Sequence, residues 1–285
     1  MSGFKGTRVG VLEAMSKDLT GFPADAAGTG VHAPGRDNGR VVAPGARRCA
    51  MNGFDAASAA APDNGISRED AETAEAAERL RNGRWGYRMA KRAFDIVFSI
   101  VVLVGLSWLY LIIAIAIKLD DPKGPVIFAQ TRVGKDGREF RMYKFRSMVA
   151  DAEARLAELL ARNEKTGPVF KLHDDPRVTR VGRVLRKVSL DELPQFVNVL
   201  KGDLSVVGPR PALPKEVAEY TPKQRQRLLA KQGLTCFWQV QPNRDDITFD
   251  EWVELDLRYI RECGVATDLK LIVQTVGCVL TAQGN

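Results

Sequence analysis

Two neighbouring carboxylates, Asp191 and Glu192, are the side chains of this sequence best placed to do chemistry. Pro194 follows them, and because proline lacks an N–H it is tolerated in the first turn of a helix but not deep inside one. The spacing therefore predicts a helix with Asp191 at the N-cap, Glu192 as its first residue and Gly202 past its end. The positive end of a helix dipole favours a phosphate beside these acids. A simple cap, or a capping box of Ser189 and Glu192, is the alternative.

Arginine is dense on both sides of the acid pair. Arg177 and Arg183 lie in the basic stretch 173–187, and Arg210 lies between two prolines at 208–211 that stiffen its backbone. Such cations lower the cost of concentrating a diphosphate beside two carboxylates, so all three are candidate phosphate ligands. A nucleic-acid patch is the rival interpretation, but no aromatic residues are interleaved for base stacking. For the Pro-Arg-Pro segment the rival is an ordinary turn.

A β-hairpin is expected upstream, with strands at 126–133 and 139–145 joined through 135–137. Lys144 and Arg146 lie at the end of its second strand, where they are candidates to face a phosphate. The alternative is a solvated strand edge whose charges guard against aggregation.

Composition narrows the choice of partner and compartment. The 285 residues are 45% hydrophobic and 27% charged, enough for one or two domains with a core. A net charge of +7 indicates an anionic partner: nucleic acid, an acidic membrane face or a phosphorylated small molecule. The four cysteines form no C-x-x-C pair, which disfavours a zinc cluster. Of the two histidines, His32 and His173, only His173 could serve a Ser-His-Asp arrangement, so carboxylate chemistry is favoured.

Residues 1–65 are rich in Gly, Ala, Pro and Asp and lack helical or strand periodicity, which is typical of disorder. No apolar run of signal-peptide length opens the chain. Residues 67–81 have the composition of a short exposed helix. The range 1–85 is therefore interpreted as a disordered cytoplasmic tail.

Residues 96–117 carry no charged side chain, and as a helix they would reach about 33 Å, enough to cross a bilayer core. Basic residues flank both ends, and the positive-inside rule places both flanks on the same side of a membrane. We therefore expect a re-entrant membrane anchor at 86–119 with its break at 105–107, where Gly105 permits a bend. A simple crossing and a buried core helix are the alternatives.

Helix starts are predicted at Thr221, Thr248 and Thr267, the first of them through a capping box. The last helix carries an apolar stripe, which is usually core, but in a membrane-tethered protein such a helix lies in the interface plane, a setting that Trp238 and Trp252 also fit. The stripe consists of Leu269, Ile272, Val273, Val276, Val279 and Leu280. The expected fold is α+β: a mostly helical, membrane-anchored catalytic domain at 120–285 with a β-hairpin and amphipathic interfacial helices.

Several short motifs occur in the order typical of one family. After the apolar segment the motifs are GPV at 124–126, QTRVG at 130–134, KFRSM at 144–148, DPRVT at 175–179, DELPQ at 191–195, GPRP at 208–211 and LDLRYI at 255–260. With these motifs the chain resembles, over residues 91–285, the bacterial sugar transferases, the monotopic phosphoglycosyl transferases that begin exopolysaccharide, capsule and glycan assembly.

This resemblance implies transfer of sugar-1-phosphate from a nucleotide diphosphate sugar, expected to be a UDP-sugar, to undecaprenyl phosphate with release of UMP. It implies that Asp191 is the nucleophile and forms an aspartyl phosphosugar, that Glu192 supports Mg²⁺, and that Arg210 holds a phosphate. The expected location is the cytoplasmic face of the bacterial inner membrane, in contact with membrane lipid and not with nucleic acid. A homodimer is left open. The alternative function is a catalytically inert scaffold of a polysaccharide export complex.

Overall fold

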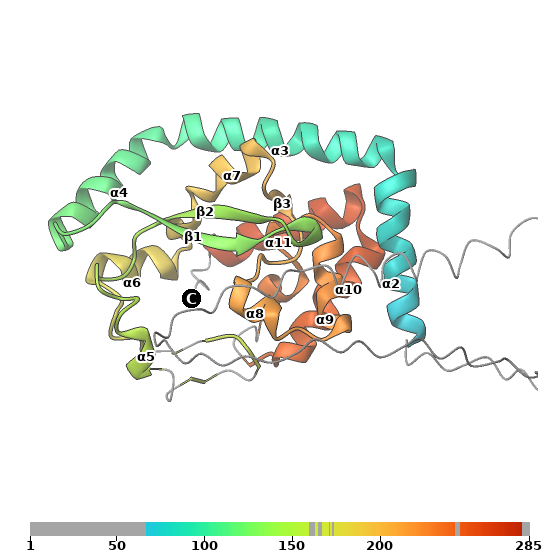
Figure 1. Ribbon diagram of the computed structural model, residues 1–285. Coiled ribbons are helices and arrows are strands. Elements are labelled where there is room, and N and C mark those ends of the chain that lie inside the picture. The colour runs from blue at the N-terminus through green and yellow to red at the C-terminus, as the bar shows by residue number, and fades with distance from the viewer. Residues whose placement is uncertain are drawn as a thin grey trace, which may run out of the picture. The chain divides into compact units, whose positions relative to one another are not determined.

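The computed structural model describes residues 67–159, 163–164, 167–170, 172, 174–242 and 246–280 (Figure 1). The predictions for the first 66 residues and for His173 lie outside these ranges. In chain order the elements are α2 (Arg68–Glu78), η1 (Arg79–Gly83), α3 (Trp85–Gly105), α4 (Ser107–Asp120), β1 (Ile127–Val133), η2 (Lys135–Gly137), β2 (Glu139–Phe145), α5 (Leu156–Leu159), α6 (Arg180–Lys187), η4 (Leu190–Glu192), α7 (Gln195–Lys201), β3 (Ser205–Val207), α8 (Pro214–Ala218), α9 (Pro222–Arg225), η5 (Gln226–Leu229), β4 (Gly233–Thr235), η6 (Phe237–Val240), α10 (Phe249–Glu262) and α11 (Val265–Leu280).

The predicted hairpin and the α+β class are confirmed. Strands β1 and β2 pair antiparallel, with Ile127 opposite Phe145 and Val133 opposite Glu139. Asp136 in the connection has φ 56°, the left-handed conformation that aspartate tolerates in tight turns. A second, parallel pair joins β3 to β4, and helices surround both pairs (Figure 1).

Helix α2 contradicts the prediction that the disordered tail extends to residue 85. It begins at Arg68, inside the range 1–85, and it packs against α10 instead of standing exposed (Figure 1). Thr73 and Ala77 on its packed face are 0% and 5% exposed, and Arg261 Nη1 donates to Thr73 Oγ1 at 2.8 Å. Because these side chains are small, the helix approaches α10 closely and buries a face that composition alone marks as weakly hydrophobic.

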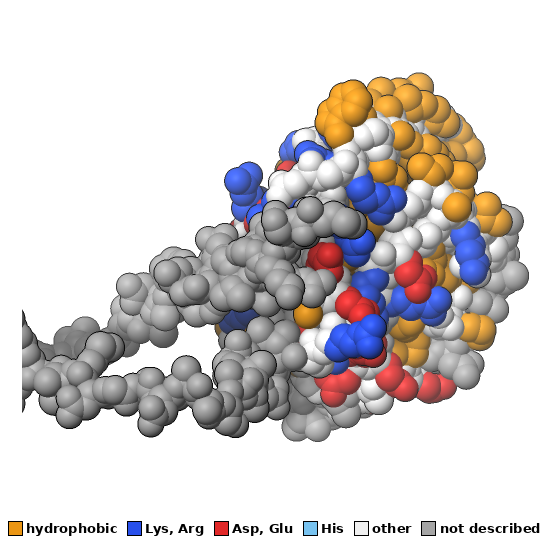
Figure 2. All heavy atoms as spheres, turned by 90° about the vertical axis from the view of Figure 1, so that its right-hand side faces the viewer, with side chains coloured by type: hydrophobic (Ala, Val, Ile, Leu, Met, Phe, Trp, Pro, Cys, Tyr) orange, Lys and Arg blue, Asp and Glu red, His pale blue; other side chains and the backbone are white. Residues whose placement is uncertain are grey.

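The apolar segment is two helices, α3 and α4, bent by 60° at Leu106. The predicted break at 105–107 is confirmed. Neither helix alone is long and apolar enough to cross a bilayer, whereas the bent pair together meets the requirement of length and composition. Ile113 and Ile117 of α4 are buried in a hydrophobic cluster, but six other apolar side chains of the pair are 46–69% exposed, which contradicts a fully buried core helix. These six are Val97, Ile100, Val101, Val104, Trp108 and Leu111. Figure 2 shows hydrophobic side chains gathered along the top of one face, above the charged ones.

The stripe of α11 is also turned outward. Val273 is 72% and Leu269 50% exposed, while Leu271 at 0% supplies the buried side of the helix. The predicted interfacial helix fits this exposure, while Ile272 of the stripe packs against the buried core that contains Leu271. Trp238 and Trp252 do not share that setting, because their rings pack together at 4.2 Å beside the main core.

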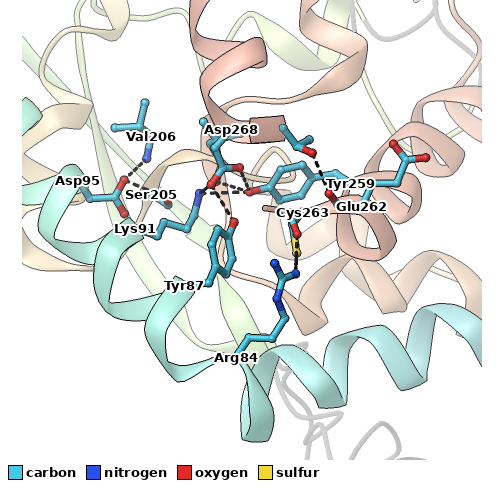
Figure 3. A network of polar contacts seen from close by, with 12 residues as sticks. Arg84, Tyr87, Lys91, Asp95, Ser205, Val206, Tyr259, Glu262, Cys263 and Asp268 are labelled. Atoms are coloured by element: carbon cyan, nitrogen blue, oxygen red, sulfur yellow. Dashed lines mark hydrogen bonds and ion pairs between the residues drawn. The ribbon is translucent and has the colours of Figure 1, made fainter. Parts of the chain in front are cut away.

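A buried polar network fastens α3 to the rest of the domain (Figure 3). Asp95, 2% exposed, accepts hydrogen bonds from Ser205 Oγ at 3.1 Å and from the Val206 N–H at 3.0 Å, both on β3. Lys91 Nζ donates to Asp268 Oδ2 at 2.8 Å and to the Tyr259 hydroxyl at 3.1 Å. The amphipathic helix is therefore held at defined positions on β3, α10 and α11.

Arg92 of α3 adds a connection that bears on the acid pair. Its guanidinium donates to the carbonyls of Val199 and Leu200 at 2.6 and 2.8 Å, and so caps the end of α7. Gly202 follows at φ 95°, the left-handed C-cap that the sequence predicts. Helix α7 and the turn before it are thereby set against α3.

Candidate active site

The acid pair lies in a 3₁₀ turn, η4, that precedes α7. Ser189 takes a left-handed conformation at φ 55° and makes no side-chain capping bond, so the capping-box alternative is wrong. The predicted N-cap is also wrong: Pro194 occupies the N-cap of α7, and Asp191 comes three residues earlier. The reason is that the chain turns sharply at Ser189 before the helix begins. Asp191 is 7% exposed.

Lys144 joins the pair from the hairpin. Its Nζ lies 2.7 Å from Glu192 Oε1 and 3.8 Å from Asp191 Oδ2. Strand β2 places it there because η4 packs against that strand. This contact places Lys144 beside the acid pair, which is the basis for including it in the site. Its ammonium group can also bind an anion there.

The two carboxyls are electrostatically unequal. Burial raises the pKa of Asp191, and the neighbouring Lys144 offsets that rise only in part. Burial acts on Glu192 in the same sense, but Lys144 and Arg210 outweigh it and hold the pKa of Glu192 below its usual range. Glu192 therefore remains ionised, whereas Asp191 carries a charge that its surroundings solvate poorly.

Arg210 lies on a loop that is fixed from two directions. The Val133 N–H at the end of β1 donates to Ala212 O at 2.8 Å, and Arg227 Nη2 donates to the carbonyl of Arg210 at 3.4 Å. The guanidinium lies 5.7 Å from the ring of Trp238 and makes no ion pair with a carboxylate in the described part of the chain. It lines a shallow hollow with Lys144 and Glu192, so its place beside the pair agrees with the prediction.

Arg186 is a residue of this site that the sequence reasoning did not select. It ends α6, where its Nε donates to Ser147 Oγ at 3.0 Å, and its charge acts on the Asp191 carboxyl. A Cβ added to Gly182 would lie 2.0 Å from Ser147 O, so only glycine lets α6 approach this segment. Spacing gave no usable signal, because Arg183, three residues earlier on the same helix, lies exposed.

Three other predicted phosphate ligands are placed differently. Arg177 is buried in an ion pair with Asp175 at 2.6 Å, and Arg146 is buried against Asp121 Oδ2 at 2.6 Å. Both guanidinium groups are used inside the protein, which contradicts their prediction as free phosphate ligands. Arg183 lies exposed on α6, and its charge is not among those that chiefly act on Asp191.

The acid pair suits a magnesium ion that is bound by only one or two protein carboxylates. Across the described ranges no group of three or more His, Cys, Asp or Glu side chains is assembled, so a metal cage of protein ligands is not present there. Mg²⁺ commonly uses one or two carboxylates and completes its shell with substrate phosphates and water. An ionised Glu192 beside Asp191 fits that arrangement.

The sequence matches a known family over most of its length. The model of the family described as bacterial sugar transferase matches residues 86–282. Galactosyl transferase CpsE of Streptococcus agalactiae is 45% identical over 201 residues, which cover 70% of this chain and 44% of that protein. Undecaprenyl-phosphate galactose phosphotransferase of Salmonella typhimurium is 43% identical, with 69% and 42% covered.

The match is more complete for a shorter relative. Exopolysaccharide production protein ExoY of Sinorhizobium fredii is 36% identical over 201 residues, covering 69% of this chain and 88% of ExoY. The chain thus spans less than half the length of the first two relatives and most of the third. The matched region contains η4, the hairpin, the Arg210 loop and the bent helix pair. On this evidence the chain belongs to the bacterial sugar transferase family.

Proposed function

We propose that this protein transfers sugar-1-phosphate from a UDP-sugar to undecaprenyl phosphate, releases UMP and so begins synthesis of a surface polysaccharide. The observation that carries the proposal is the buried Asp191 carboxyl beside an ionised Glu192, with Lys144, Arg186 and Arg210 around them. Cations in excess of carboxylates suit a diphosphate substrate.

The chemistry runs in two displacements. A carboxylate oxygen of Asp191 attacks the phosphorus that carries the sugar, and the bond from that phosphorus to the bridging oxygen breaks. The bridging oxygen keeps the electron pair and leaves as part of UMP, while Asp191 becomes an acyl phosphate. A phosphate oxygen of undecaprenyl phosphate then attacks the same phosphorus and releases the Asp191 carboxylate.

Each neighbour of Asp191 has a distinct part in these steps. Burial keeps the Asp191 carboxylate poorly solvated and therefore reactive toward phosphorus. Lys144 and Arg210 neutralise charge on the phosphoryl oxygens. Glu192, with Asp191, would hold Mg²⁺, which supplies further charge neutralisation at the diphosphate when bound.

The exposed apolar faces support a membrane location. Helices α3, α4 and α11 turn large hydrophobic side chains outward, and a polyprenyl acceptor resides in the bilayer. We place the bent pair as a re-entrant anchor in the bacterial inner membrane, with the acid pair on the cytoplasmic side, because both flanks of the pair are basic.

Covalent labelling tests the proposal. Full-length protein with Mg²⁺ and a panel of UDP-sugars labelled in the sugar phosphate, without lipid acceptor, should carry label on Asp191 and release one UMP per label. Asp191→Asn should abolish both, and Asp250→Asn, which changes an exposed aspartate of α10, should alter neither. Turnover of Asp191→Asn at the wild-type rate would refute the nucleophile. Normal polysaccharide in Asp191→Asn cells would favour an inert scaffold.

A further inference from the structure

A cavity of about 100 Å³ is lined by three arginines, Arg132, Arg210 and Arg227, and it shares Arg210 and Pro211 with the hollow beside Glu192. Arg227 is neutralised, because its Nη2 lies 2.6 Å from Asp256 Oδ2 and both side chains are at most 3% exposed. Arg132 and Arg210 have no such ion pair with a carboxylate among the residues described. Glu216 also lines the cavity, with one carboxylate oxygen accepting the Leu213 N–H at 2.8 Å, and it offsets their charge only in part.

Arg132 has an unused hydrogen-bond donor. Its Nη1 donates to Pro211 O at 3.1 Å and its Nη2 to Gln130 Oε1 at 2.8 Å, so both acceptors are neutral. Its buried Nε finds no acceptor in the described structure. Most buried donors in proteins are satisfied, and an exception calls for an explanation such as a ligand.

The electrostatics of Arg132 support the same conclusion. Burial and the neighbouring charge of Arg210 lower the pKa of Arg132 to about 10, although Glu216 acts in the opposite sense. Two guanidinium groups that repel each other in one cavity are stabilised when an anion binds between them.

We infer that Arg132 and Arg210 together bind the phosphate that leaves with the nucleoside, so that Arg132 is a leaving-group ligand. This inference rests on the proposed transfer reaction. Arg210 lines both the hollow beside Glu192 and the cavity of Arg132, so it reaches both phosphates of a diphosphate donor. When the phosphorus–oxygen bond breaks, the bridging oxygen retains the electron pair and the departing UMP gains a negative charge. Arg132 stabilises that charge and contacts nothing that remains on Asp191.

Arg132 should affect the first half-reaction, in which UMP leaves, and not the second, in which undecaprenyl phosphate accepts the sugar phosphate. Arg132→Gln removes the charge, Arg132→Lys keeps the charge but loses the forked donors, and Arg141→Gln removes an exposed charge from strand β2 of the same hairpin. In the first half-reaction we measure the rate at which full-length protein releases UMP and becomes labelled. In the second, labelled protein freed of UMP is chased with undecaprenyl phosphate. Equilibrium binding of UMP to each variant is measured as well.

For Arg132→Gln we expect the first half-reaction to slow at least about 10-fold, UMP to bind at least about 10-fold more weakly, and the second half-reaction to stay within about twofold. For Arg132→Lys, the rate of the first half-reaction and the affinity for UMP should lie between those of Arg132→Gln and the wild type. For Arg141→Gln, both should equal those of the wild type. Equal slowing of both halves would show that Arg132 acts only by holding Pro211, and unchanged UMP affinity would also overturn the inference. If the wild type takes no label on Asp191, the proposed function fails, and UMP binding still decides the role of Arg132.

Discussion

Lys91 and Lys144 are alike in burial, with side chains 17% and 19% exposed, yet they belong to polar regions of opposite character. Lys91 lies in the network between α3 and α11, where Asp268 at 2.8 Å matches its charge and the Tyr259 hydroxyl adds a neutral partner (Figure 3). Lys144 lies between the carboxyls of Asp191 and Glu192, with Arg186 and Arg210 also acting on the pair.

The two regions differ in how fully their charged groups are paired and in whether a ligand can reach them. In the α3 network each charged group has an ion-pair or hydrogen-bond partner within the protein, so an added ion would find these groups already occupied. The acid pair has cations in excess, and Glu192 lines an open hollow with Lys144 and Arg210, so we expect an anionic substrate to complete its electrostatics. Balanced networks of this kind position elements, whereas unbalanced ones bind and react.

Among substitutions that test this comparison, the largest effect on activity is expected at Arg210. We expect Arg210→Gln to lower kcat/KM about 100- to 1,000-fold, because the guanidinium meets charge that develops on the phosphoryl groups. The free energy of unfolding should change by less than about 0.5 kcal/mol, since no described carboxylate loses an ion pair. Labelling kinetics measure the loss of activity, and urea unfolding measures the change in the free energy of unfolding. A loss of stability as large as the loss of activity would contradict the comparison.

Substitution of one aspartate in each region should give opposite signs of stability change. Asp268→Asn leaves Lys91 without its countercharge, and we expect the free energy of unfolding to fall by about 2–4 kcal/mol. Asp191→Asn should raise it at pH 7. The raised pKa of Asp191 means that the ionised form weakens the fold, so wild-type stability falls as pH rises through that pKa and the variant escapes this loss.

Unfolding curves at pH 7 and at a pH below 3.8, where the Asp191 carboxyl is protonated in both states, test the sign. The stabilising effect of Asp191→Asn should disappear at the acid pH. If Asp191→Asn destabilised the protein at pH 7 as much as Asp268→Asn does, the two regions would be equivalent and the comparison would fail.

The pH dependence of activity offers a smaller test. Activity requires ionised Asp191, so it should fall as pH drops through the raised pKa of that carboxyl. Lys144 opposes the rise, so Lys144→Met should move the acid limb of kcat/KM to higher pH. Lys201→Met, which changes an exposed lysine bonded to the Tyr143 hydroxyl at 3.1 Å, should leave the limb in place. A shift toward lower pH in Lys144→Met would contradict this assignment.

The smallest expected effect belongs to an exposed ion pair outside both regions. Arg81 Nη2 and Asp136 Oδ1 lie 2.7 Å apart, but their side chains are 48% and 41% exposed. We expect Arg81→Ala to change the free energy of unfolding by less than about 1 kcal/mol and transfer activity not at all. Thermal unfolding at low and high salt measures this change, and a large salt-independent loss would show that the position of η1 depends on the pair more than its exposure suggests.

Local features were predictable from the sequence. The hairpin follows from strand-forming residues on both sides of a tight turn, the helix break from Gly105 within an apolar run, and the start of α9 from the capping box of Thr221. The adjacency of Asp191 and Glu192 needs no folding at all. Each of these is decided by residues within a few positions of one another, where backbone geometry and capping dominate.

The choice among arginines was decided only by the tertiary structure. Arg146 and Arg177 are committed to Asp121 and Asp175, whereas Arg186 has no such ion pair among the described residues and its charge acts on the Asp191 carboxyl. Nothing in the local sequence separates these guanidinium groups. Whether a cation is available to a substrate depends on which carboxylates and carbonyls the folded chain brings within hydrogen-bonding distance, and that is set by packing between segments far apart in sequence.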